Sequence, residues 1–201
     1  MMVTKTIIEQ TDRRIFNGAT SGVVFTRFPL YQNDYFSDVQ EIISETIKRY
    51  GHEEWRLITL TCELHGHLGI YAVLGAKMGL FAREVLGAGH DELRIVSMAG
   101  SKPPVSCLND GLQVSTGATI GHGLFSVKEV IQPVPEAKFT YNGKTVTIFL
   151  DEEIQEKIEG DIKEILAETG GLTAEYWQKI RELGLEVWRT YDRRKIFMIK
   201  P

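Results

Sequence analysis

Residues 68–86 have the sequence LGIYAVLGAKMGLFAREVL, whose apolar pattern predicts a helix. The glycine-rich residues 87–89 follow at once and predict the C-terminal end of that helix. Glycine inside a helix costs about 0.5 to 1 kcal/mol relative to alanine, so it usually marks a close approach of another backbone. A stripe of small residues recurs here at spacings of three to four: Ala72, Gly75 or Ala76, and Gly79. The stripe therefore predicts a helix seated tightly on a sheet, with packing against a second copy of the chain as the alternative.

The residues before this helix predict a helix followed by a strand. Apolar residues recur at intervals of three and four over residues 34–50, and Gly51 is expected to end that helix. Residues 56–62, RLITLTC, are typical of a short buried strand, which would run directly into residues 63–67, ELHGH. Residues 15–30 are rich in apolar and β-branched types and predict an extended lead-in or a hairpin.

The residues after the helix predict a strand, a short helix and three late strands. The strand is expected over residues 93–98, and the short helix begins just after Cys107 and ends at Gly117. Asn142-Gly143 lies between two apolar runs and is the strongest short-range signal of a hairpin. The three late strands are expected over residues 124–130, 139–141 and 145–149.

The chain is expected to become helical again beyond Asp151. One strongly acidic helix would stop at Gly170-Gly171, a second would start after Thr173, and residues 195–199 are expected to form a final strand. The acidic helix carries an apolar stripe that includes Leu166, and it is predicted to pack on the core through the isoleucines of that stripe: Ile154, Ile158, Ile162 and Ile165. The whole order predicts an α+β fold, a mixed sheet with an α-β-α-β-β-β core and additional C-terminal helices.

Composition favours a self-standing protein without a large charged surface. The 201 residues, 43% of them apolar, are enough to bury a sizeable core, and we expect a single domain over residues 1–201 with an extension at 151–201. The net charge of −4 argues against nucleic acid as a partner. A signal peptide and a membrane span are not expected, so the predicted location is the cytoplasm. Only two cysteines occur, which argues against a disulfide scaffold.

His65 and His67 are the first candidates for chemistry. On an extended backbone they would share one face, and two neutral imidazoles could bind a borderline metal such as Zn²⁺. Glu63 would lie on the same face as a possible carboxylate ligand or general base. The competing interpretation is a structural histidine pair that is hydrogen-bonded to its neighbours, with Glu63 as a solvated strand end.

Two further segments carry candidate residues. Cys107 lies near a helix N-terminus, which would lower its thiol pKa and favour metal ligation or nucleophilic attack; a small buried side chain is the alternative. His122 is flanked by Gly121 and Gly123, whose backbone amides could approach a ligand. An ordinary tight loop explains the same residues.

Two motifs together resemble a known family. Residues 65–68, HGHL, precede the glycine-bearing helix, and residues 107–121 read CLNDGLQVSTGATIG. In this order and separation they are similar to the FmdE family, which takes its name from formylmethanofuran dehydrogenase, over roughly residues 56–150. The resemblance implies an α-β-α-β-β-β core, often a homodimer, and a metal site that draws on the histidines and the cysteine of the family's first motif and on the cysteine of its second.

The sequence departs from this family at positions that matter for a metal. Residues 69–71 are GIY where the family usually has Cys-Pro-Gly, and residues 117–119 are GAT where it often has Gly-Cys-Thr. Both changes make the site poorer in sulfur and favour Zn²⁺ or a similar divalent metal that prefers nitrogen and oxygen. An acidic helix pair stands where some members have a cysteine-rich zinc module.

Three functions follow as hypotheses. The first is a metal-binding FmdE-like accessory or substrate-binding protein, related to formylmethanofuran dehydrogenase, with His65, His67 and Cys107 as metal ligands and a small molecule or metal as partner. The alternative is a zinc-dependent hydrolase or lyase that uses a metal-bound water, with Glu63 or His122 as acid or base. The third is a structural interaction module without a metal. Whether the chain is an enzyme stays open.

Overall fold

The computed structural model describes residues 28 and 31–200 of the chain. The lead-in or hairpin predicted over residues 15–30 lies outside the described residues, apart from Phe28. The chain divides into two compact units, residues 1–56 and 57–201, with the boundary inside one helix. The single domain over residues 1–201 stays a prediction.

The described part of the first unit is helical. It contains η1 (Gln32–Asp34), α2 (Ser37–Gln40) and the first half of α3 (Ile43–His65). Gly51 has φ 88° and ψ 167°, a conformation that favours glycine, so the helical path is interrupted where the sequence predicted a helix end.

The strand predicted over residues 56–62 is wrong, because α3 continues helically through these residues to His65. Leu57, Ile58 and Thr61 are buried, and their spacing is that of one helix face. The Thr61 hydroxyl donates to the Leu57 carbonyl at 2.8 Å, four residues back along the helix. A short apolar run fits a buried strand or a buried helix equally well, so its pattern alone did not distinguish them.

The centre of the second unit is the contact between α4 (Ile70–Leu86) and α5 (Leu108–Thr116). The predicted helix end is confirmed, since Gly87 caps α4 in the left-handed conformation with φ 67°. A Cβ placed on Gly75 would lie 2.1 Å from the Leu108 carbonyl oxygen, and one on Gly79 would lie 2.0 Å from the Ser115 hydroxyl. The small-residue stripe therefore packs against α5, and the prediction that it contacts the sheet is wrong.

The sheet has five strands in the order β2-β1-β3-β4-β5. β1 runs parallel to β2, and all the other pairs are antiparallel. Asn142 (φ 47°) and Gly143 (φ 75°) form the predicted two-residue hairpin turn between β3 and β4. The strand bounds are β1 Arg94–Ser97, β2 Phe125–Val127, β3 Glu136–Tyr141, β4 Lys144–Leu150 and β5 Phe197–Lys200. The order α4-β1-α5-β2-β3-β4 confirms the α+β fold and the α-β-α-β-β-β core.

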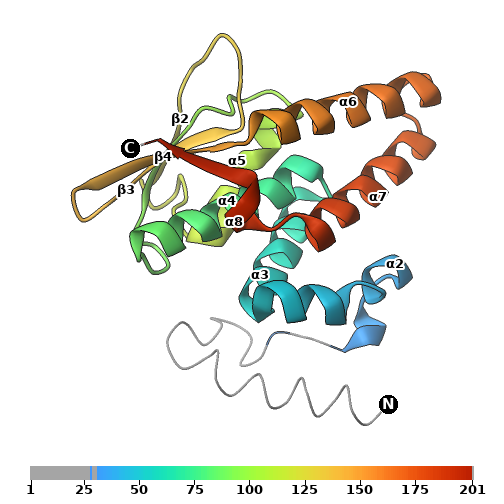
Figure 1. Cartoon of the computed structure of the whole chain (residues 1–201), viewed down its shortest axis with the longest axis horizontal. Coiled ribbons are helices and arrows are strands. Elements are labelled where there is room, and N and C mark those ends of the chain that lie inside the picture. Colours follow the sequence, from blue (N-terminus) through green and yellow to red (C-terminus); the bar gives the residue numbers. More distant parts are fainter. Residues whose placement is uncertain (1–27, 29–30, 201) are drawn as a thin grey trace. The chain divides into compact units, whose positions relative to one another are not determined.

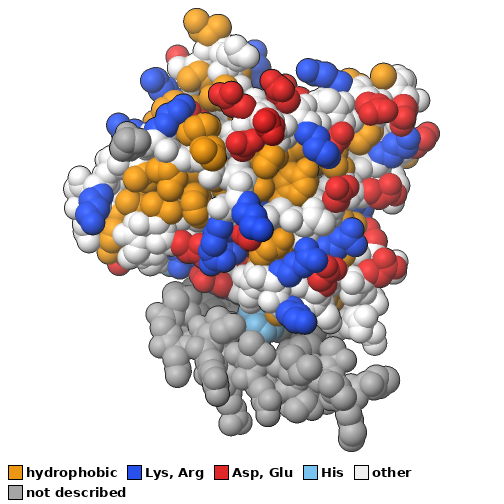
Figure 2. Space-filling view, viewed as in Figure 1, with side chains coloured by type: hydrophobic (Ala, Val, Ile, Leu, Met, Phe, Trp, Pro, Cys, Tyr) orange, Lys and Arg blue, Asp and Glu red, His pale blue; other side chains and the backbone are white. Residues whose placement is uncertain are grey.

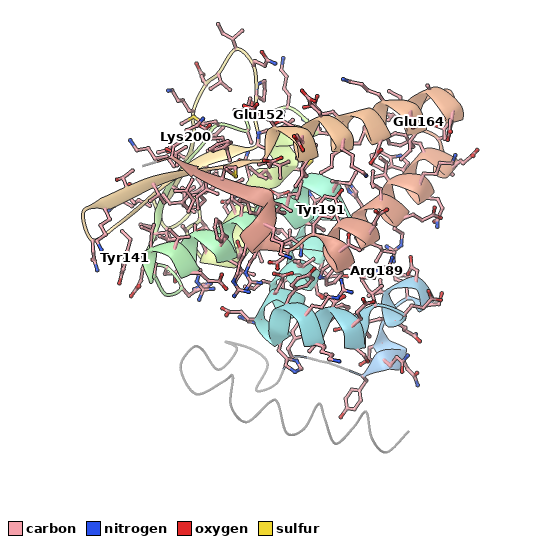
Figure 3. All side chains as sticks on the ribbon, viewed as in Figure 1. Tyr141, Glu152, Glu164, Arg189, Tyr191 and Lys200 are labelled. Carbon is pink, nitrogen blue, oxygen red and sulfur yellow. The ribbon has the colours of Figure 1, made fainter. Side chains whose placement is uncertain are left out.

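The C-terminal extension consists of α6 (Glu152–Thr169), α7 (Ala174–Thr190) and α8 (Arg193–Ile196), followed by β5. Figure 1 shows α6 and α7 as a neighbouring pair. The predicted isoleucine stripe of α6 is the less exposed side of the helix, and Ile158 on it is fully buried. Glu152 and Glu164 project to the outside (Figure 3). Acidic and basic side chains are intermixed on the face that Figure 2 shows, so the charges of this pair form a solvated face.

The basic run at residues 193–195 attaches the extension to α4. Arg194 donates to both carboxylate oxygens of Glu84, at 3.1 and 2.8 Å, and the buried Arg193 donates to the same carboxylate. Hydrogen bonds from two arginines to one carboxylate are charge-assisted, and they hold α8 against α4. None of the described helices is long and apolar enough to cross a membrane.

Candidate functional site

The two candidate histidines lie in the short connection between α3 and α4. His65 is the last residue of α3, and Gly66, with φ 83°, turns the chain so that its amide donates to the Cys62 carbonyl at 2.9 Å. His67 follows in that turn, and Gly69 is the N-cap of α4. The strand geometry predicted for this motif is therefore wrong, and a left-handed glycine brings the imidazoles together instead.

The two imidazoles face one small space. Their ring centroids are 4.3 Å apart and their planes are tilted by 41°. A Cβ placed on Gly69 would lie 3.1 Å from Nε2 of His65 and 3.2 Å from Nε2 of His67. The φ of Gly69 is −100°, which any residue can adopt, so the space and not the backbone explains this glycine. A side chain here would fill the point at which both Nε2 atoms converge.

Asp110 orients one of these rings from α5. Its Oδ2 lies 2.7 Å from Nδ1 of His65, and the His65 side chain is only 10% exposed. A carboxylate here accepts a hydrogen bond from Nδ1–H and so favours the neutral ring with its proton on Nδ1. In that tautomer Nε2 has a free lone pair. That buried Nε2 has no hydrogen-bond partner among the residues that the structure describes. An unpaired buried nitrogen is costly, so its presence points to a ligand.

His67 is the more exposed member of the pair. Burial, and then the neighbouring His65, lower the pKa of His67 below its usual value. A lowered imidazole pKa favours the neutral ring, which is the form that binds a metal. Both histidines are thus arranged to present a nitrogen lone pair to the space beside Gly69.

Trp177 of α7 lies beside His67, and the sequence analysis did not single it out as a site residue. Its ring lies 5.2 Å from the ring of His67 at an interplanar angle of 70°. The helix approaches this connection closely, since a Cβ on Gly184 would lie 2.3 Å from Cδ2 of Leu68. The sequence separates Trp177 from the histidines by more than a hundred residues and carries no local signal for this contact.

Cys107 lies at the N-cap of α5, where the sequence predicted it, but its expected activation is wrong. Burial raises the pKa of the Cys107 thiol, and the neighbouring Asp110 carboxylate raises it further. A backbone hydrogen bond to the thiol lowers its pKa by less than these two effects raise it. Among the described residues, no group of three or more histidine, cysteine, aspartate or glutamate side chains is arranged to hold a metal ion. The three-ligand centre of His65, His67 and Cys107 therefore stays a prediction.

Both thiols are expected to react slowly with iodoacetamide at neutral pH. Burial raises the pKa of Cys62 to about 12, so its thiolate fraction falls roughly 1,000-fold below that of a free cysteine. Cys107 should react faster than Cys62 but more slowly than a free thiol, because its pKa is also raised. Peptide mass spectrometry over time gives both rates, and guanidinium-unfolded protein is the control. Fast alkylation of Cys107 in the folded protein would support the lowered pKa predicted from the helix N-terminus.

Glu63 is not brought to the histidine pair. It lies two residues before His65 on a helix, where such residues do not share a face, and its side chain is exposed while His65 is largely buried. The prediction that Glu63 and His65 lie on one face assumed a strand. It is wrong for the same reason as the strand itself.

His122 lies at the other end of α5. Its Nδ1 is 3.1 Å from the carbonyl oxygen of Gly117, the C-cap of α5, and 3.2 Å from Oδ1 of Asp91. Asp110 lies in the first turn of the same helix, and a rise of 1.5 Å per residue separates Asp110 from Gly117 by about 10 Å. His122 and His65 are thus anchored at opposite ends of α5.

Backbone amides of the loop around His122 donate hydrogen bonds within the loop itself. The amide of His122 donates to the Thr119 hydroxyl at 3.2 Å, and the amide of Gly123 donates to the Ile120 carbonyl at 3.0 Å. Gly123 has φ 66°, which explains the glycine by the turn itself. The turn geometry is that of an ordinary tight loop, the alternative that the sequence offered. Ligand binding by Gly121 and Gly123 stays a prediction.

Comparison with known proteins identifies relatives of this chain. A family model described as "FmdE, Molybdenum formylmethanofuran dehydrogenase operon" matches residues 64–194, about two thirds of the sequence. A protein from Archaeoglobus fulgidus named "Probable S-adenosyl-L-methionine-binding protein" is 36% identical over 69 residues. That segment is 33% of this chain and 19% of the Archaeoglobus protein, so the similarity spans about a fifth of the relative's length.

Proposed function

This chain belongs to the FmdE family, and we propose that it is a metal-binding accessory or substrate-binding protein in which His65 and His67 hold a divalent metal such as Zn²⁺. The observation that carries the proposal is the buried Nε2 of His65, which has no hydrogen-bond partner among the described residues while Asp110 occupies the opposite ring nitrogen. A carboxylate behind a histidine is the usual arrangement around a protein-bound metal.

The donor set fits a nitrogen-preferring metal. His65 and His67 supply two imidazole nitrogens on one space, and Zn²⁺ accepts imidazole readily. Cys107 is the proposed third ligand, because it precedes Asp110, which contacts His65, by about one helical turn. When bound, such an ion supplies Lewis-acid polarisation of a carbonyl or phosphoryl oxygen. The residues of the chain would position the ligand beside Gly69 and shield it from water on the α5 side.

Substrate binding is better supported than hydrolysis. A zinc-dependent hydrolase or lyase needs an acid or base beside the metal, and Glu63 and His122 were the predicted candidates. Glu63 lies on another side of α3, and His122 is anchored at the far end of α5. Asp110 is already engaged with His65. The pair is therefore equipped to hold a ligand, with no proton-transfer group assigned.

The proposal is tested by the metal content of the purified chain. Protein made without added metal should contain about one zinc per chain by elemental analysis, lose it to a chelator, and regain it at the same ratio when zinc is added back. Protein that neither retains zinc nor binds added zinc would support the structural module instead. Light scattering on the same samples tests the homodimer, which was predicted from the family resemblance and from the apolar surface of the small-residue helix and the late strands.

A further inference from the structure

The aromatic side of the histidine site belongs to α7. Tyr176 and Trp177 open this helix, and their rings stand edge to face at 5.1 Å. Trp177 in turn stands edge to face against His67. Tyr176 is buried, so it supports the indole from behind. The Gly184 contact with Leu68 fixes the helix against the connection that carries the histidines.

Trp177 differs from the other tryptophans in its exposure. It is 45% exposed, whereas Trp55 and Trp188 are almost completely buried. Tryptophan contributes most when its large ring is covered, and half-exposed aromatic rings held in place by neighbours are typical of surfaces that receive a ligand. Two contacts hold this ring, yet much of its surface stays open to solvent.

A second, independent observation points to a ligand at the same place. The side chain of His65 is nine-tenths buried, and its Nε2 faces the space beside Gly69 without a partner among the described residues. His67 lies between that space and Trp177, because its ring contacts both the His65 ring and the indole. A polar binding point and an aromatic surface are therefore adjacent, with His67 as their common neighbour.

We propose that Trp177 is a specificity-determining residue, and that the site takes a small ligand in which a metal-binding group is joined directly to a planar aromatic or heteroaromatic ring. The inference rests on the proposed function, because the histidine pair holds the metal that receives the polar end. The ring of the ligand packs on the exposed indole. This assigns the C-terminal extension a role in ligand selection in addition to its packing on the core.

Two hydroxamates provide the test. Acetohydroxamate and benzohydroxamate carry the same metal-binding group, and only the second has a ring. Their affinities for the zinc-loaded full chain are measured by calorimetry for the wild type, Trp177→Ala and Trp177→Phe. We expect the wild type to prefer benzohydroxamate by roughly 10-fold, Trp177→Ala to bring the ratio near one, and Trp177→Phe to keep most of the preference. Ile131→Ala, which removes another exposed apolar side chain, should keep the wild-type ratio.

The outcomes separate the two proposals. If the protein holds zinc and binds both hydroxamates but Trp177→Ala leaves their ratio unchanged, the role of Trp177 is overturned and the metal site stands. If the chain binds no zinc and neither hydroxamate, the proposed function itself fails. Circular dichroism of each variant shows whether a changed ratio comes from a folded protein.

Discussion

The His65→Ala variant is expected to bind zinc roughly 100-fold more weakly than the wild type, or worse, because it removes one of the two imidazoles that face the space beside Gly69. Replacing the carboxylate behind the ring should cost less. Asp110→Asn is expected to lower zinc affinity by roughly 10- to 100-fold, since an amide orients Nδ1 of His65 without adding negative charge. A larger loss of zinc affinity in His65→Ala than in Asp110→Asn would identify His65 as a metal ligand supported by Asp110. If His65 had only a structural role, the two variants would not weaken zinc binding in this order.

Competition against a chromogenic zinc chelator at neutral pH measures these affinities. His122→Ala is the matched control, because it removes an imidazole that is anchored at the far end of α5 and should keep the wild-type affinity. If folded His65→Ala retains wild-type zinc binding while His122→Ala loses it, the metal belongs to the other end of the helix and the assignment of the site is wrong.

Helix ends and turns were predictable where the local backbone conformation favours one residue type. Gly87 ends α4 and Gly117 ends α5 in the left-handed conformation that glycine adopts most easily. Asn142-Gly143 forms the turn whose positive φ angles suit these residues. Each of these positions was identified from the sequence, because its requirement is local and does not depend on distant packing.

The strand predicted over residues 56–62 shows where this reasoning ends. A short run of apolar residues records burial, and burial is common to a central strand and to a helix packed on several sides. A buried strand and a buried helix differ in the elements that they pack against. One face contains Leu57, Ile58 and Thr61 only when the backbone is helical. The sequence alone does not predict which element that face contacts.

The geometry of the candidate site was predictable in part. The rings of His65 and His67 do lie together, although a turn after Gly66, and not a strand, places them there. Asp110 was not predicted as a site residue, and 45 residues separate it from His65. Trp177 was not predicted as a site residue either. Both side chains reach the histidines through packing between helices, and a single sequence carries no signal of such pairs.

The Gly111→Ala variant is expected to destabilise the protein by about 2 to 3 kcal/mol. A Cβ on Gly111 would lie 2.2 Å from the Ala72 carbonyl oxygen and 2.3 Å from the Ala76 amide nitrogen, and both are backbone atoms that cannot rotate away. The helices α4 and α5 would have to separate. This cost exceeds the gain of about 1 kcal/mol that alanine brings to a helix interior, so the net change is a loss.

Gly160→Ala is the matched control, because Gly160 lies inside α6 with nothing within 4 Å of the added Cβ. It should stabilise the protein by about 0.5 to 1 kcal/mol, the opposite sign for the same substitution. Urea unfolding measures both variants. Since Asp110 precedes Gly111, separating the helices also moves the carboxylate away from His65, and Gly111→Ala should lose zinc affinity while Gly160→Ala does not. A neutral or stabilising Gly111→Ala would mean that α4 and α5 do not approach as closely as described.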